Sequence, residues 1–194
     1  MIIVDDFIKD ESLLKELQDD KTFFNENGKY KWWGGPWSSE ASNLKERLIQ
    51  EIWIHNSPWD FPRYNSISLE GFEYWTGRYS PDTQHPSTLD LHLDKDEALW
   101  QSTLNTGVPI LSIPIMGSVY YPIEMDIDGG YLEIFSNGED KEPERVAAKH
   151  NRLIIFPAGE HPHRVTEVTR GTRSAIAINL WNGIPDGLNP DLIK

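Results

Sequence analysis

Residues 88–94 hold the side chains best suited to chemistry. Three leucines alternate there with three polar residues: Leu89, Leu91 and Leu93 with Asp90, His92 and Asp94. This alternation is typical of a β-strand with one apolar face. Because residues i and i+2 of a strand lie side by side, His92 and Asp94 can bind one metal ion together. They would supply two of the three ligands of a 2-His-1-carboxylate iron site. A His-x-Asp match also arises by chance, and a surface strand with a solvated polar face is the simpler alternative.

A second alternating stretch, residues 172–181, places one charge on a face of small residues. Arg173, Ala175, Ala177 and Asn179 share this face, and Ser174, Ile176, Ile178 and Leu180 share the other. Burying an unpaired guanidinium is costly, so we expect an anionic group beside Arg173. An intramolecular carboxylate, Glu133 or Glu124, is an alternative to a ligand, and so is a position of Arg173 at the rim of the face.

Two helices are expected before residue 60, and residues 64–194 contain no convincing long helix. Residues 2–4 favour a short strand, and residues 10–20 a helix with leucines on one face. A second helix is predicted to begin at a cap on Ser38 or Ser39 and to end near His55. Residues 21–37 between them are rich in aromatic rings and contain Gly34-Gly35-Pro36. We interpret them as an irregular loop docked on the core, with a flap over a binding site as the alternative.

From residue 64 onward the chain shows short apolar runs separated by Gly, Pro, Asn and Asp. Strands are predicted at residues 66–69, 72–79, 88–94, 110–116, 119–123, 131–135, 152–156, 163–169 and 172–181. This spacing predicts a mainly β protein with N-terminal helices (α+β), with its strands in a sandwich or barrel of jelly-roll type. We expect one domain over residues 1–194, with a helical buttress (1–60), a core (64–181) and a C-terminal tail (182–194).

Composition limits the partners. The 194 residues carry a formal charge of −13, which disfavours a nucleic acid partner. There is no cysteine, which excludes disulfides and thiolate metal sites and fits a reducing compartment. No apolar run approaches the length of a membrane span, and the N-terminus has no signal-peptide pattern. We therefore expect a cytoplasmic protein with no membrane partner, and the oligomeric state stays open.

Four motifs, in order, resemble the 2-oxoglutarate- and Fe(II)-dependent dioxygenases, especially the branch similar to prolyl 4-hydroxylases. They are His92-Leu93-Asp94, Gly129-Gly130-Tyr131-Leu132, His163-Arg164-Val165 and Arg173, and Trp75-Thr76-Gly77-Arg78-Tyr79 fits the strand that precedes the first. The resemblance covers residues 74–181, and residues 1–60 match only as a helical N-terminal region. Ordered together, the four motifs are far more specific than His-x-Asp alone.

The resemblance implies a double-stranded β-helix with Fe(II) held by His92, Asp94 and His163. It also implies that Arg173 binds the far carboxylate of 2-oxoglutarate and that Tyr79 lines the same pocket. Tyr120, Tyr121 and Ser112 are weaker candidates for that pocket. With O₂ as co-substrate, the implied reaction oxidises a substrate and releases succinate and CO₂, and the protein supplies geometry, electrostatics and protection from side reactions.

Residues close to these motifs leave two choices: which histidine is the third ligand, and whether the flanking aspartates are solvated. His161 and His163 alternate across Pro162, and the resemblance favours His163 as the ligand, because its spacing to Arg173 and the following Val165 fit the family. His161, which lies between a turn and Pro162, is then expected near the ligands or at the rim. Asp90 and Asp96, which flank the first motif, are expected to be solvated.

The leading functional hypothesis is a hydroxylase acting on a peptidyl or small-molecule substrate. One alternative is a cupin-type metal-dependent dioxygenase that does not use 2-oxoglutarate and so has no need of Arg173. Another is a jelly-roll binding module without catalysis, in which the His and Asp residues are incidental. A zinc hydrolase fits the ligand spacing less well. Residues 30–37 and Trp100 are candidates for shaping the entrance.

Overall fold

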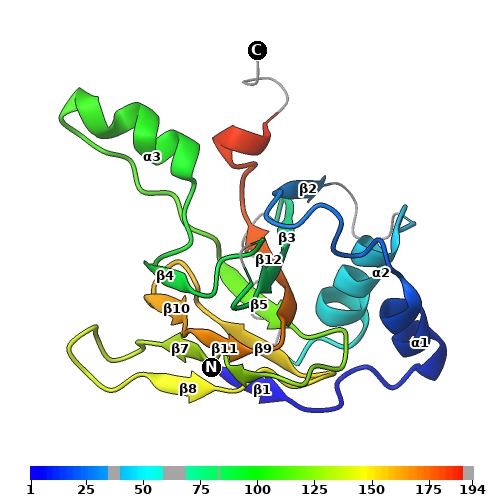
Figure 1. The fold of residues 1–194 in the computed structure, drawn as a ribbon. Helices are drawn as coiled ribbons and strands as arrows, with labels where there is room; N and C mark the ends of the chain where they lie inside the picture. Colours follow the sequence, from blue (N-terminus) through cyan, green and yellow to red (C-terminus); the bar gives the residue numbers. More distant parts are fainter. Residues whose placement is uncertain (35–39, 59–68, 83, 190–194) are drawn as a thin grey trace.

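Two antiparallel sheets face each other in the computed structural model, which describes residues 1–34, 40–58, 69–82 and 84–189 (Figure 1). The six-stranded sheet has the order β1 (Ile2–Val4), β9 (Leu153–Phe156), β5 (Met116–Tyr120), β12 (Arg173–Trp181), β3 (Gly71–Tyr79), β2 (Lys31–Gly34). The four-stranded sheet has the order β4 (Leu89–His92), β10 (His163–Val165), β7 (Leu132–Ile134), β8 (Glu144–Val146). A short pair, β6 (Asp128–Gly129) and β11 (Val168–Arg170), stands apart. This is the jelly roll that the spacing of the strands predicted.

Each face of the six-stranded sheet packs against a different layer, as its alternation requires. One face carries Ile176, Ile178 and Leu180 of β12 into a core shared with the N-terminal helices. The opposite face, with Ala175, packs in a second cluster against Leu132 and other residues of the four-stranded sheet. Arg173 and Asn179 of β12 therefore lie between the two sheets, where the site forms.

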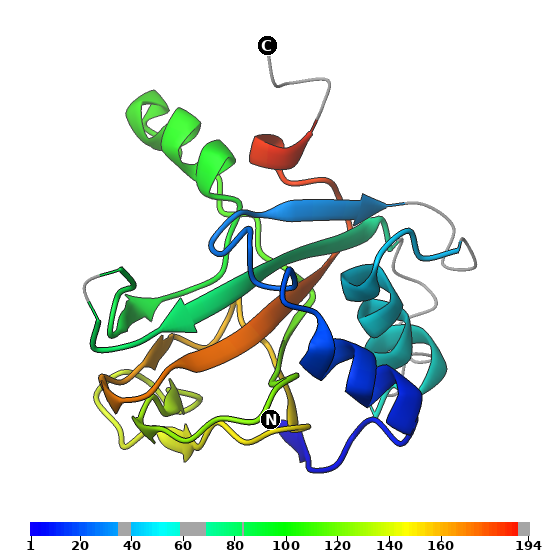
Figure 2. The same cartoon turned by 45° about the vertical axis from the view of Figure 1, so that its right-hand side comes forward.

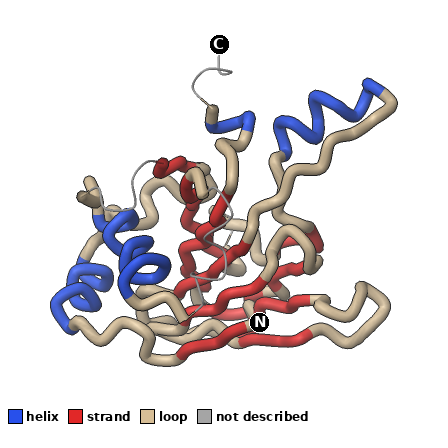
Figure 3. The backbone as a smooth tube through the Cα atoms, turned by 180° about the vertical axis from the view of Figure 1, so that it is seen from behind, coloured by secondary structure: helices blue, strands red, loops and turns tan. Residues whose placement is uncertain are grey.

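The helices α1 (Glu11–Asp19) and α2 (Leu44–Gln50) cover the outer face of the six-stranded sheet, as Figures 2 and 3 show from two further directions. Leu13 and Leu17 of α1 and Leu48 of α2 are buried against sheet residues. A π-helical turn, η1 (Glu51–His55), extends α2. Both helices therefore pack against one face of this sheet.

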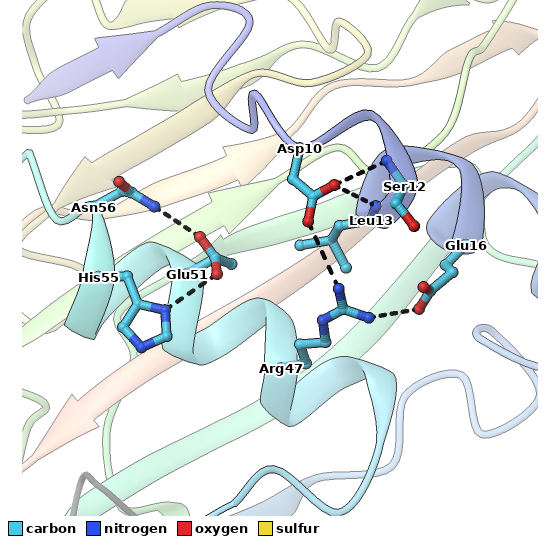
Figure 4. Close-up of polar contacts among 8 residues, drawn as sticks. All are labelled: Asp10, Ser12, Leu13, Glu16, Arg47, Glu51, His55 and Asn56. Carbon is cyan, nitrogen blue, oxygen red and sulfur yellow. Dashed lines mark hydrogen bonds and ion pairs between the residues drawn. The ribbon is translucent and has the colours of Figure 1, made fainter.

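Polar contacts fix the ends of these helices (Figure 4). Asp10 caps α1 by accepting hydrogen bonds from the backbone N–H groups of Ser12 and Leu13. Arg47 joins α2 to α1 through ion pairs with Asp10 (3.7 Å) and Glu16 (2.7 Å). The predicted cap of the second helix is wrong, because α2 begins at Leu44 and Asn43 caps it. Ser38 and Ser39 lie outside the described residues.

Two further predictions of local structure are wrong. Residues 31–34, predicted to be irregular, form the edge strand β2 and pair with β3. Residues 110–115 are not a strand, and Ile110 and Leu111 are exposed. Pro109 and Pro114 bracket that segment and cannot donate ladder hydrogen bonds, so regular pairing begins only at Met116. Of the strand predicted at 66–69, residues 66–68 lie outside the described residues.

The segment after β4 leaves the body of the protein. The helix α3 (Glu97–Thr103) and the turn η3 (Leu104–Thr106) project from it (Figure 1), and α3 contacts the turn η4 (Asp186–Leu188) near the C-terminus. This short helix was not predicted from the sequence. Among the described residues no helix combines the length and the apolarity that crossing a bilayer requires.

Candidate active site

His92, Asp94 and His163 converge between the sheets at the end of β4 and β10. These two strands are neighbours, and His92 and His163 are paired across them. Asp94 Oδ1 lies 3.4 Å from His92 Nε2 and 3.6 Å from His163 Nε2. One ligand atom from each residue lies within 4.8 Å of the other two, which suits a single metal ion. Two imidazoles and one carboxylate form a donor set typical of non-haem Fe(II).

A β-bulge in β4 sets which side chains point into the site. The partners of His163 and Val165 on β4 are His92 and Leu89, so one extra residue of β4 lies between the two pairs. As a result Leu89 lines the same cavity as His92, and Leu91 is exposed. The prediction that the three leucines of residues 88–94 share one face of the strand and the three polar residues the other is therefore wrong. His92 and Asp94 do lie side by side, as predicted.

Backbone carbonyls orient both imidazole rings. His92 Nδ1 lies 2.7 Å from the Asp90 carbonyl oxygen, and His163 Nδ1 lies 3.0 Å from the His161 carbonyl oxygen. Each contact places a proton on Nδ1 and leaves the Nε2 lone pair free for a metal ion. His163 is buried, and burial lowers the pKa of its imidazole, which favours the neutral ring that a metal ion requires.

The second oxygen of Asp94 is held by an amide. Asn179 Nδ2 on β12 donates a hydrogen bond of 3.0 Å to Asp94 Oδ2, while Oδ1 faces the two histidines. Burial raises the pKa of Asp94, but the hydrogen bond with His92 and the nearby His163 outweigh it, so the pKa lies below its usual value. The carboxylate is thus ionised and fixed with one oxygen toward the two histidines, where a metal ion would be bound.

Arg173 lies at the other end of β12, 2% exposed, and its partners are neutral. Its Nε donates to the Gly130 carbonyl oxygen (3.0 Å) and its Nη2 to the Tyr121 hydroxyl (2.8 Å), and the Tyr79 ring centroid lies 5.6 Å from its Cζ. Within the described part of the chain no carboxylate pairs with it. Glu133, one of the two intramolecular partners considered above, instead binds Arg145 and Arg164.

The remaining candidates from the sequence take different positions. Tyr79 and Arg173 line one narrow inner cavity together with His92 and His163. Tyr120 points to the helical face of the sheet, where its hydroxyl donates to Asn151, so only Tyr121 of the two adjacent tyrosines reaches Arg173. Ser112 gives a backbone contact, accepting a hydrogen bond from the N–H of Asp96.

Asp96 is buried, contrary to the expectation that it is solvated. Its carboxylate caps α3 at the N–H of Leu99 (3.0 Å) and accepts a second hydrogen bond from the N–H of Asp186 (2.7 Å). Asp90 is exposed, as expected.

Two residues that the sequence analysis did not assign to the site complete it: Asn179 and Glu73. Strands β3 and β12 pair in the register Tyr79–Arg173, Gly77–Ala175, Trp75–Ala177 and Glu73–Asn179. These four pairs line the space between the sheets, from Arg173 at one end to Glu73 at the other. The alternation on β12 already placed Asn179 with Arg173, and the same period applied to residues 73–79 would have found Glu73.

Comparison with known proteins agrees with this geometry. The family model of the 2OG-Fe(II) oxygenase superfamily matches residues 83–181, just over half of the chain. A Pseudomonas putida prolyl-4-hydroxylase has a similar structure, with a TM-score of 0.62 and 18% identity over 93% of this chain and 91% of that chain. A viral collagen prolyl hydroxylase from Paramecium Bursaria Chlorella virus-1 gives a TM-score of 0.53 and 16% identity, over 92% and 93%. No curated protein matches the chain.

The chain belongs to the 2OG-Fe(II) oxygenase superfamily. It is therefore a non-haem iron dioxygenase that depends on 2-oxoglutarate and binds an oxidisable substrate, and neither the cupin-type enzyme nor the binding module is the better description. The donor set of two imidazoles and one carboxylate fits the Fe(II) that this family uses.

Proposed function

We propose that His92, Asp94 and His163 bind Fe(II), and that Arg173 and Tyr79 bind the far carboxylate of 2-oxoglutarate. One observation supports this most strongly: a three-ligand cluster lies on one cavity with a buried arginine that has no carboxylate partner among the described residues. Once bound, Fe(II) and 2-oxoglutarate would supply the oxidising chemistry with O₂ as co-substrate, one oxygen atom going into succinate as CO₂ is released and the other to the substrate.

The residues of the chain then divide the remaining work. The guanidinium of Arg173 offers N–H groups beyond those used by Gly130 and Tyr121, and these suit a carboxylate. Burial raises the pKa of Tyr79, so its hydroxyl stays protonated and can donate a hydrogen bond. Asn179 holds Asp94 in place, and Gly77 and Ala175 leave space between the metal position and Arg173.

We propose hydroxylation as the outcome, because both structural neighbours are named prolyl hydroxylases and their fold extends over nearly the whole chain. A peptidyl and a small-molecule substrate both fit this proposal. We further propose a cytoplasmic protein that binds neither nucleic acid nor membrane, which the charge of −13 and the lack of cysteine support.

An anaerobic titration tests the assignment of the ligands. Fe(II) and then 2-oxoglutarate are added to metal-free protein, and the iron-to-2-oxoglutarate charge-transfer band is recorded in the visible spectrum. We expect the band in the parent protein and none in His163→Ala. Arg173→Ala should weaken 2-oxoglutarate binding by about 10- to 100-fold, because it removes charge-assisted hydrogen bonds.

Surface residues of the same types provide matched controls. His150→Ala and Arg47→Ala remove exposed side chains that contact the N-terminal helix α1, at Gln18 and Glu16, and should leave the band and the 2-oxoglutarate affinity unchanged. A band that survives in His163→Ala, or an affinity that Arg173→Ala does not change, would contradict the proposal.

A further inference from the structure

Beyond the metal position lies an outer cavity of about 380 Å³, on the side away from Arg173. It shares His92, Asp94, Trp75 and Asn179 with the inner cavity, so a molecule in the outer cavity reaches the metal position directly. The inner cavity ends at a cation, Arg173, and the outer one contains the carboxylate of Glu73. Glu73 pairs with Asn179, which is six positions from Arg173 along β12, or about 20 Å of extended strand.

Glu73 has no positive partner among the described residues, although it is only 9% exposed. Its Oε2 accepts hydrogen bonds from two neutral donors, Trp181 Nε1 (3.1 Å) and Asn179 Nδ2 (3.4 Å). Its Oε1 accepts none within the described structure, and it is not one of the fully buried unsatisfied atoms. This oxygen is therefore open to the cavity that Glu73 lines.

The other charged groups of the outer cavity are already engaged. Asp96 caps α3 and binds the N–H of Asp186, and Lys95 pairs with Glu97 at 2.6 Å. Asp94 faces the two histidines and Asn179. Glu73 is the acid of this cavity that lacks both a cation and a structural task for its second oxygen.

An aromatic wall stands next to this acid. The rings of Tyr30 and Trp75 lie with centroids 4.7 Å apart, and both residues line the outer cavity with Glu73. Aromatic faces bind ammonium and guanidinium groups as well as the carbon chains that carry them. An acid beside two rings is a suitable site for an organic cation.

We propose that the outer cavity binds a substrate through a protonated amine or guanidinium, with the charge at Glu73 Oε1 and the carbon chain against Tyr30 and Trp75. This inference rests on the proposed function, because it places the uncharged part of the same substrate at the metal position. It makes Glu73 a specificity-determining residue, and it favours lysine-like or arginine-like substrates over neutral ones such as a proline peptide.

Calorimetric binding to the protein loaded with Fe(II) and 2-oxoglutarate, without O₂, tests the proposal. The probes are N-acetyl-lysine methylamide and N-acetyl-arginine methylamide, each compared with a neutral counterpart, the Nζ-acetylated lysine and the citrulline analogue. We expect each cation to bind at least about tenfold more tightly than its neutral counterpart, as loss of a hydrogen bond to a charged group implies. A pentapeptide with a central lysine distinguishes a peptidyl substrate from a small molecule.

Substitutions test whether Glu73 causes the preference for cationic probes. Glu73→Gln keeps an acceptor for Trp181 and removes the charge, so the preference for cations should fall to about threefold or less. Glu142→Gln, an exposed site with the same change in net charge, should keep the full preference. Equal binding of charged and neutral probes to the parent protein would overturn the proposal even if Glu73→Gln fails to fold, and so would an unchanged preference in Glu73→Gln.

The charge-transfer band, recorded on the same samples, separates the two levels of inference. A band together with equal binding of the probes refutes the cationic substrate alone. The absence of the band in the parent protein refutes the proposed function itself.

Discussion

Two buried glutamates of this protein show how surroundings decide what a carboxylate does. Glu133 is held between Arg145 and Arg164. Burial alone would raise the pKa of this acid, but the two arginines have the larger effect, so its pKa lies below the usual value. The partners of Glu73 in the described part of the chain are neutral donors, and burial together with the charge of Asp94 raises the pKa of its carboxyl to about 7. Glu133 therefore joins strands β7, β8 and β10. Glu73 has no such ion pair among the described residues, which is why we propose that it binds a ligand.

The raised pKa of Glu73 predicts that this residue costs stability at high pH. A folded-state pKa above the usual 4.5 means that the folded protein binds the proton more tightly, so stability falls as pH rises from about 4.5 to about 7. In metal-free protein, Glu73→Gln should therefore raise the free energy of unfolding at pH 8 by about 1–3 kcal/mol, and by much less at pH 5. Urea unfolding at the two pH values measures this.

Glu133→Gln provides the opposite case for comparison. Its lowered pKa means that its stabilising contribution is present above the unfolded value of 4.5 and is lost as pH falls, so this variant should lose stability at pH 8. A Glu73→Gln variant that is destabilised at pH 8 would show that the carboxylate of Glu73 serves the fold and not a ligand.

Among the strands, the short pair β6 and β11 has the task of positioning Arg173. Gly129 has a φ of +78°, and a Cβ there would lie 2.0 Å from the Glu167 carbonyl oxygen. The next residue, Gly130, accepts the hydrogen bond from Arg173 Nε. Gly129 thus has a backbone conformation that other residues disfavour, and Gly130 contacts Arg173 directly.

Gly129→Ala should consequently harm both stability and cofactor binding. We expect a loss of about 2–4 kcal/mol, because the new methyl group meets backbone and the positive φ is strained. The affinity for 2-oxoglutarate should fall as well, since Arg173 loses its backbone anchor. Chemical denaturation and the anaerobic titration measure the two effects. Gly183→Ala, where a Cβ meets nothing within 4 Å, should change stability by no more than about 0.5 kcal/mol. Unaltered 2-oxoglutarate affinity in Gly129→Ala would refute the role of this pair.

Local period-two patterns predicted the parts of the site that depend on single strands. They placed His92 beside Asp94 and put Arg173 on the face shared with Ala175, because alternation is fixed by the backbone itself. Features that depend on pairing between distant segments were missed. The bulge in β4 depends on its register with β10, and the burial of Asp96 depends on Asp186, 90 residues further on. The edge strand β2 was not predicted from the sequence, because it has only four residues and ends at Gly34, too short a run to show a clear period.

The complete chain carries a charge of −13, and this field acts on anything that approaches the cavity. The two ligands of the proposed reaction differ in sign: 2-oxoglutarate is a dianion, and the proposed substrate is a cation. A negative protein attracts the second and repels the first, and salt weakens both effects. In the proposed function, the local positive charge of Arg173 offsets this repulsion and binds the anion at the inner end.

Association kinetics should therefore depend on salt in opposite directions for the two ligands. Between about 0.01 M and 0.15 M ionic strength the screening length falls from about 30 Å to about 8 Å. We expect the association rate of the lysine probe to fall severalfold over this range and that of 2-oxoglutarate to rise, because screening removes attraction in one case and repulsion in the other. The Nζ-acetylated probe, which is neutral, should show almost no change.

Stopped-flow tryptophan fluorescence under anaerobic conditions measures these rates, since Trp75 lies in the wall of both cavities. Dissociation rates should change little, because the contact of the cation with Glu73 is buried and poorly screened. A charged and a neutral probe with the same salt dependence would mean that the field of the whole protein does not steer this substrate. Any preference for cations would then come from Glu73 and its neighbours after contact.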